Sequence, residues 1–180
     1  MTREFLKTYF QSYQDLLFKD EQLEYVETIA KIWLECSKRG GKVILAGNGG
    51  SSAMASHVAV DLTKNAGVRA INFNEPDLIT CFANDYGYEQ WVKQALEFYM
   101  DPEDVVVLIS SSGKSPNIVN AANYAKSQGV PVITLSGFAS DNPLRSSGDV
   151  NLWVDNDVYN IVEMIHHIWL LAGIDYIMER

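Results

Sequence analysis

The chain has 180 residues, of which 47% are hydrophobic and 21% charged, the balance of one globular domain rather than a disordered segment. Its formal net charge is −9, with a pI near 4.7, and the sequence holds no cluster of lysine and arginine. This charge argues against sequence-independent binding to nucleic-acid phosphates and against a membrane-surface role through a basic helix.

The first 40 residues carry helical patterns. Apolar residues recur at spacings of three and four from Phe5 to Leu17, which predicts one amphipathic helix. A second helix is predicted from Asp20 to the stop at Arg39-Gly40-Gly41. We interpret residues 1–40 as a helical arm that covers the sheet or pairs with another subunit, and the sequence leaves both options open.

Residues 41–180 alternate short apolar runs with helical stretches. Continuous apolar runs are typical of strands that are covered on both faces, as in the parallel sheet of an α/β fold. We therefore predict one α/β domain, with ligands at the carboxyl ends of the strands. The runs are Val43 to Ala46, Val68 to Phe73, Val105 to Ile109, Val130 to Leu135 and Val150 to Val154.

The loop after the first run is rich in small residues. Such a turn lets backbone approach a ligand, and a helix N-terminus offers free N–H groups to an anion. The spacing matches neither the dinucleotide-binding Gly-x-Gly-x-x-Gly nor a P-loop. The alternative is a tight turn that only packs. The loop reads Gly47-Asn48-Gly49-Gly50-Ser51-Ser52-Ala53.

The loop after the third run, Ser110-Ser111-Ser112-Gly113-Lys114-Ser115-Pro116-Asn117, places four hydroxyls and one lysine within six residues. Ser115 is a natural N-cap, and Pro116 suits the first position of a helix. Several donors at the positive end of a helix dipole suit a phosphate monoester. The alternative is a capped turn, which needs only one hydroxyl.

Three motifs together resemble the SIS (sugar isomerase) domain, in its phosphoheptose isomerase branch: the two loops above, and Asn84-Asp85-Tyr86-Gly87 between them. The resemblance implies a flavodoxin-like three-layer α/β fold with a five-stranded parallel sheet, and a homotetramer that holds a phosphosugar at subunit interfaces. It also implies conversion of sedoheptulose 7-phosphate to a heptose 7-phosphate for cell-surface polysaccharide.

The same resemblance assigns binding residues. It implies that the phosphate is held by Ser110, Ser112 and Ser115. The sugar would be faced by Asn48 and Ser51, and the same cleft would be lined by Asn84 and Asp85. Lys114 stands where the branch usually has asparagine. The candidate binding residues are Asn48, Gly49, Gly50, Ser51, Asn84, Asp85, Ser110, Ser111, Ser112, Lys114 and Ser115.

Aldose–ketose isomerisation needs a base, an acid on the carbonyl side and exclusion of water. His57 and Asp61 lie four residues apart on one helix face. The resembled enzymes have His and a catalytic Glu at these positions, so Asp61 is the candidate base. Its side chain is shorter than that of the Glu, which withdraws the carboxylate. The alternative for Asp61 is a solvated or salt-bridged helix residue.

The last predicted helix, Val158 to Ile177, departs further from the branch. Aligning the family's Glu on Glu163 puts Leu170 at its catalytic His, and sliding by one residue puts Leu171 there. His166 shares one stripe with Val162 and Leu170, so we expect it to face the cleft, with His167 turned ~100° away. Either His166 or His57 is then the partner acid. The alternative is a helix histidine that is merely hydrogen-bonded.

Some relatives bind zinc through this helix and the His57 and Asp61 positions. Because Val162 and Leu170 replace two ligands, we expect no metal and no cofactor, although a variant site of His57, Asp61 and His166 stays open.

A second hypothesis is a non-catalytic phosphosugar-binding sensor or protein-interaction module, since some relatives assist replication initiation. Cys36 and Cys81 read as reduced core thiols, no secretory signal is recognised and no apolar run approaches the ~20 residues of a membrane span. We therefore expect a cytoplasmic protein with neither nucleic-acid nor membrane partners.

Overall fold

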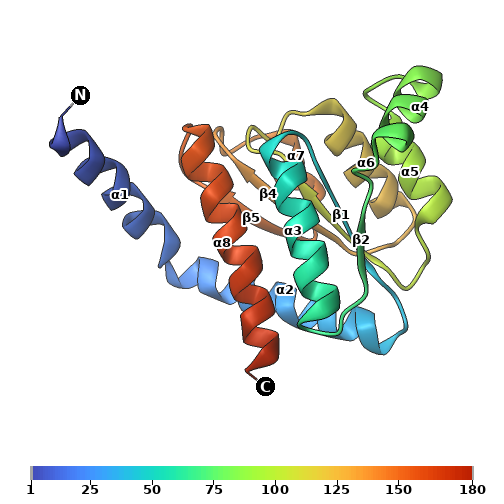
Figure 1. Cartoon of the computed structure of the whole chain (residues 1–180), viewed down its shortest axis with the longest axis horizontal. Coiled ribbons are helices and arrows are strands. Elements are labelled where there is room, and N and C mark those ends of the chain that lie inside the picture. Colours follow the sequence, from blue (N-terminus) through green and yellow to red (C-terminus); the bar gives the residue numbers. More distant parts are fainter. Residues whose placement is uncertain (1, 180) are drawn as a thin grey trace.

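Five strands form one parallel sheet in the order β2-β1-β3-β4-β5 in a computed structural model that describes residues 2–179 (Figure 1). Every residue of β1, β3 and β4 is buried, because helices cover both faces of the sheet. The predicted flavodoxin-like α/β fold is confirmed, since this is the strand order of that fold. The strands are β1 (Val43–Gly47), β2 (Ala70–Asn72), β3 (Val105–Ile109), β4 (Val132–Gly137) and β5 (Val150–Val154).

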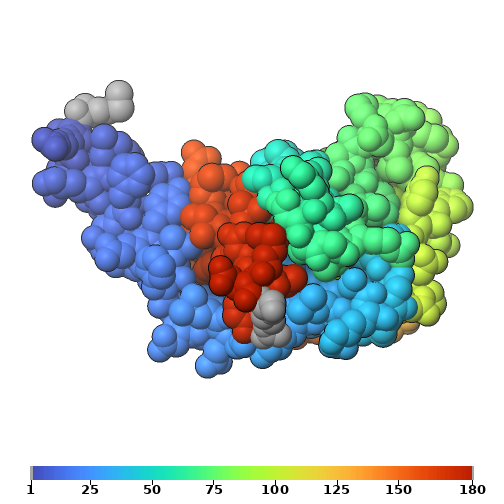
Figure 2. All heavy atoms as spheres, turned by 60° about the horizontal axis from the view of Figure 1, so that its bottom comes forward, coloured from blue at the N-terminus to red at the C-terminus, as the bar shows by residue number. Residues whose placement is uncertain are grey.

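Helices form the outer two layers. α2, α3 and α8 pack on one face of the sheet, and α5, α6 and α7 on the other. α3 and α8 lie side by side at the surface (Figures 1 and 2), and both begin at the carboxyl edge of the sheet. The helices are α1 (Arg3–Leu17), α2 (Asp20–Lys38), α3 (Gly50–Lys64), α4 (Pro76–Tyr86), α5 (Trp91–Tyr99), α6 (Pro116–Ser127), α7 (Pro143–Ser147) and α8 (Tyr159–Met178).

The two helices of the predicted arm behave differently. α1 has no buried residue and projects from the body of the molecule (Figure 1), tied at its C-terminal half by Tyr13, whose hydroxyl donates to Asn160 O at 3.2 Å. α2 is part of the core, since Ile29 and Trp33 are fully buried against the sheet and α8. Only α1 is therefore an arm in the geometric sense.

α8 is long and apolar enough to cross a membrane by length and composition, but half of that stretch is buried within the protein. It packs against α2 and α3, as a core helix does.

The prediction that both cysteines are core thiols is wrong for Cys81. Cys36 is buried, whereas Cys81 is exposed on α4 beside Asp85. The apolar neighbours Leu78, Ile79 and Phe82 pack against the core, and Cys81 is left exposed.

Candidate active site

The two polar loops meet at the carboxyl edge of the sheet, because β1 and β3 are neighbours and Gly47 pairs with Ile109. A cavity of about 110 Å³ lies between them. The loops supply most of its lining, and α8 supplies the rest. The lining residues are Asn48, Ser51, Ile109, Ser110, Ser111, Ser112, Ser115, Tyr159 and Glu163.

The serine loop presents its hydroxyls to this cavity rather than to its own helix. Ser115 precedes α6 but makes no capping hydrogen bond, and its Oγ lies 3.0 Å from Ser110 Oγ. Pro116 has no N–H and the Ile118 N–H donates to Ser115 O at 3.1 Å, so in the first turn of α6 the N–H of Asn117 is the donor left for an anion within the described residues. Lys114 is exposed and does not line the cavity, although its backbone N–H donates to Ser112 Oγ at 3.3 Å.

Gly113 makes the turn of the serine loop. Its φ of +65° is a left-handed conformation, and a Cβ there would overlap the side chain of Asn142. The loop thus needs glycine at this position for both conformation and space.

A pair of amides ties the two loops together. Asn48 Nδ2 donates to Asn117 Oδ1 at 3.0 Å, and Asn117 Nδ2 donates back to Asn48 Oδ1 at 2.9 Å. Tyr88 adds its hydroxyl to Asn48 Oδ1 at 3.1 Å. Sequence reasoning missed Asn117, which is 1% exposed, because within the α6 pattern it reads as an ordinary polar residue of the first turn.

Glu163 brings a carboxylate to the cavity. Its Oε1 lies 3.4 Å from Ser111 Oγ, and a Cβ on Gly50 would overlap its carboxylate. Gly50 therefore lets α3 approach α8 closely at the cavity. Tyr159, also missed from the sequence, lies one turn earlier on the same face.

Three side chains from the packed helices α3 and α8 form a series of close polar contacts. Asp61 Oδ2 lies 3.3 Å from His57 Nε2, and His57 Nδ1 lies 3.0 Å from His167 Nε2. The side chains of His57 and Asp61 are 50% and 27% exposed, so the series is open to a substrate. Burial, and secondarily the neighbouring His57, lower the pKa of His167, so at neutral pH its ring is uncharged.

The expectation that His166 faces the cleft is wrong. Its side chain is fully buried, and its Nε2 donates to Ser136 O of β4 at 3.0 Å. Burial lowers its pKa to about 4. Val162 and Leu170 share its stripe and are fully buried too, so this stripe faces the core.

A different face of α8 is turned toward the cavity and α3. It carries Tyr159, Glu163 and His167, which lie four residues apart, and Glu163 and His167 each directly follow a residue of the buried stripe. His167, which the sequence analysis placed away from the cleft, is thus the α8 histidine that meets His57.

Asn84 and Asp85 do not line the cavity in the single chain. Both are exposed near the end of α4, where Asn84 Nδ2 donates to Asp85 Oδ1 at 2.9 Å. Gly49 is exposed too, with a φ of +54°, just before α3.

The residues present do not fit the zinc site that the resemblance implies for some relatives. Val162 and Leu170 are apolar and buried at two of its ligand positions. Between residues 2 and 179 no group of three histidine, cysteine, aspartate or glutamate side chains has the arrangement of a metal site.

Comparisons with known proteins agree on one family. The sequence profile of the SIS domain matches residues 8–137. The chain is 34% identical to the phosphoheptose isomerase of Sodalis glossinidius, over 95% of this chain and 93% of that protein.

Two solved structures are similar throughout. A phosphoheptose isomerase from Francisella tularensis superposes with a TM-score of 0.87, at 26% identity and with 100% of both chains covered. The phosphoheptose isomerase of Neisseria gonorrhoeae gives a TM-score of 0.85 at 26% identity, over 97% of this chain and 98% of that one.

Proposed function

Because this chain belongs to the SIS domain family, we propose that it is a phosphosugar aldose–ketose isomerase acting on a ketose phosphate of the sedoheptulose 7-phosphate type. One observation carries the proposal. The serine-lined cavity lies at the first turns of α3 and α8, and the Asp61–His57–His167 series lies further along the same two packed helices, so an anion site and acid–base groups share one surface.

The spacing suits an extended sugar phosphate. Ser51 lines the cavity near the start of α3, and His57 follows six residues later, about 9 Å along the helix axis. A phosphate on Ser110, Ser112 and Ser115 would leave the far carbons of the sugar near His57. Glu163, whose negative charge repels phosphate, is placed to accept hydrogen bonds from sugar hydroxyls.

The acid–base series supplies the chemistry. We assign Asp61 as the base that takes a proton from C1 and, after this proton has exchanged with solvent, delivers one to C2, while the histidine pair protonates the carbonyl oxygen and accepts the hydroxyl proton of the neighbouring carbon. The enediol forms and collapses with no net proton change, and no redox cofactor is needed. His167 fixes the ring of His57 because the two nitrogens 3.0 Å apart need one donor and one acceptor.

The first test is proton NMR with sedoheptulose 7-phosphate in heavy water. We expect deuterium at C2 of an aldose phosphate product. Asp61→Asn should lower the exchange rate by roughly 10²–10⁴-fold with the fold retained, the usual range for losing a general base. Ser115→Ala is the matched variant at the other end of the site, and it should raise KM more than it lowers kcat.

A second candidate function is phosphosugar binding without turnover. It is favoured by the buried Val162 and Leu170, which stand where the resembled enzymes have glutamine and the catalytic histidine. Saturable broadening of the sugar signals without deuterium exchange would establish this function and refute the isomerase.

We also propose a homotetramer in the cytoplasm. Phe5 and Phe10 on α1 are 61% and 65% exposed, and Val60, Met164 and Ile168 are exposed on α3 and α8 beside the histidine pair. Apolar surface of this kind marks interfaces, and a second copy here would cover the exposed histidine pair and exclude water from it. Light scattering on the full chain measures the mass, and a monomer at micromolar concentration contradicts the assembly.

A further inference from the structure

Phe138 follows β4 directly and has an unusual backbone conformation. Its φ is +59°, and among residues 2–179 it is the only residue other than glycine with a positive φ. A side chain with a Cβ disfavours this conformation, which persists only where the surrounding structure holds it in place. Because such strain concentrates at functional sites, the contacts of Phe138 bear on function.

Hydrogen bonds hold the backbone of this turn on both sides. Gly137 N–H donates to Ser111 O of the serine loop at 2.8 Å, and Phe138 N–H donates to Asn156 O at 2.9 Å. Asn156 also accepts, through its Oδ1, a hydrogen bond from Val158 N–H at 2.8 Å. The turn is therefore tied to the serine loop on one side and to the residue before α8 on the other.

The Phe138 ring lies against Tyr159, the first residue of α8. The two ring centroids are 4.8 Å apart and the planes are inclined at 57°, which is a favourable aromatic arrangement. Tyr159 lines the serine-lined cavity, whereas Phe138 does not. Because Tyr159 is 56% exposed, its side chain would exchange freely among rotamers without a neighbour that limits it. Phe138 is that neighbour, so its effect on the cavity passes through Tyr159.

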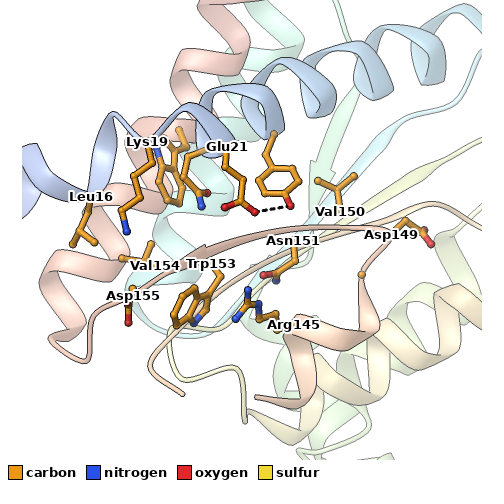
Figure 3. A pocket seen from close by; sticks show the side chains of 14 residues that line it. Leu16, Lys19, Glu21, Arg145, Asp149, Val150, Asn151, Trp153, Val154 and Asp155 are labelled. Carbon is orange, nitrogen blue, oxygen red and sulfur yellow. Dashed lines mark hydrogen bonds between the residues drawn. The ribbon is translucent and has the colours of Figure 1, made fainter. Parts of the chain in front are cut away.

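A larger cavity, of about 310 Å³, lies between the α1–α2 turn and β5 and shares no lining residue with the serine-lined cavity (Figure 3). An anion there would meet the carboxylates of Glu21, Asp149 and Asp155 against the charges of Lys19 and Arg145. Lys19 therefore provides a control, because its charge lies in a polar cavity of the same chain but outside the site proposed for the phosphosugar.

We propose that Phe138 is a positioning residue that holds the Tyr159 ring as a wall of the sugar phosphate site. The ring packs against the bound ligand and keeps water from the phosphate, which strengthens the hydrogen bonds of the serine hydroxyls. Tyr159 precedes His167 by about 12 Å along the axis of α8, so the wall lies at the end of the site farther from the histidine pair. The inference rests on the proposed function, because it takes a phosphosugar as the ligand of this cavity.

The test is calorimetric titration of the full chain with D-sedoheptulose 7-phosphate, in a double-mutant cycle of Phe138→Gly and Tyr159→Ala. Phe138→Gly should raise the dissociation constant roughly three- to tenfold, the change that the loss of one aromatic pair corresponds to. Tyr159→Ala should raise it by about tenfold or more, and the double variant should bind like Tyr159→Ala, because Phe138 acts only through Tyr159. Phe138→Tyr and Tyr159→Phe keep both rings and should bind as the wild type does. Phe138→Gly should melt no earlier than Phe138→Ala, because only glycine takes a positive φ without strain.

Lys19→Gln is the control and should leave the dissociation constant unchanged. A loss of affinity in Lys19→Gln as large as that of Tyr159→Ala would place the ligand in the larger cavity and overturn the inference. A Phe138→Gly protein that binds as the wild type does, or losses that add in the double variant, would overturn the role of Phe138 while the proposed function stands, because the wild type still binds. A wild type that does not bind the sugar phosphate would refute the proposed function and the wall with it.

Discussion

Acid should destabilise this protein measurably through one buried histidine. His166 has no exposed surface, its only hydrogen bond is from Nε2 to Ser136 O, and its Nδ1 has no partner in the described chain. Burial lowers its pKa from 6.5 to about 4. The lowered value means that the unfolded chain binds a proton more readily than the folded one, so stability is lost as the pH falls below 6.5.

The size of the effect follows from these two values. Between pH 7 and pH 5 the unfolded His166 becomes protonated while the folded one stays almost entirely neutral. Linkage then removes about 2 kcal/mol of unfolding free energy over this interval, and roughly 3 kcal/mol once the pH reaches the folded pKa. No charged neighbour contributes to the shift, so the loss should be insensitive to salt.

The assay is urea unfolding at several pH values and one fixed protein concentration, for the wild type and for His166→Leu. The difference in unfolding free energy between the two should change by about 2 kcal/mol from pH 7 to pH 5, in the direction that favours the variant in acid. His167→Gln is the adjacent control and should keep most of the acid sensitivity. Parallel pH profiles for wild type and His166→Leu would refute the reasoning.

Three further substitutions test the fold and the site. Gly113→Ala should destabilise the protein by at least ~1 kcal/mol and abolish phosphosugar binding in calorimetry, whereas Gly129→Ala, with a φ of +74° but open space around it, should carry only the smaller conformational cost. Asp104→Ala should cost about 3 kcal/mol in urea unfolding, because it breaks a buried pair with Lys42 at 2.6 Å. Lys114→Ala should weaken binding of the sugar phosphate severalfold and reduce its salt dependence; unchanged affinity would show that this lysine is only solvated.

The sequence by itself determined the architecture and the position of the serine loop to which we assign the phosphate. Continuous apolar runs as short as Val105–Ile109 are typical of strands covered on both faces, and five of them alternating with helical stretches predict a parallel sheet. The serine loop was also recognisable, because its hydroxyls and a following Pro116 are adjacent in the chain and need no distant partner.

Only the tertiary structure decided which face of α8 meets α3 and the serine-loop cavity. This helix is apolar around most of its circumference, and neighbouring residues such as His166 and His167 differ by ~100° in direction. Packing against α2, α3 and the sheet turned His166 into the core and His167 toward His57. An alignment of the helix pattern that is wrong by one residue exchanges the two histidines. The same reason applies to Asn117, which acts through a partner 69 residues away in the chain. Local pattern fixes the kind of element, whereas the contacts that a side chain makes depend on surfaces brought together from distant parts of the sequence.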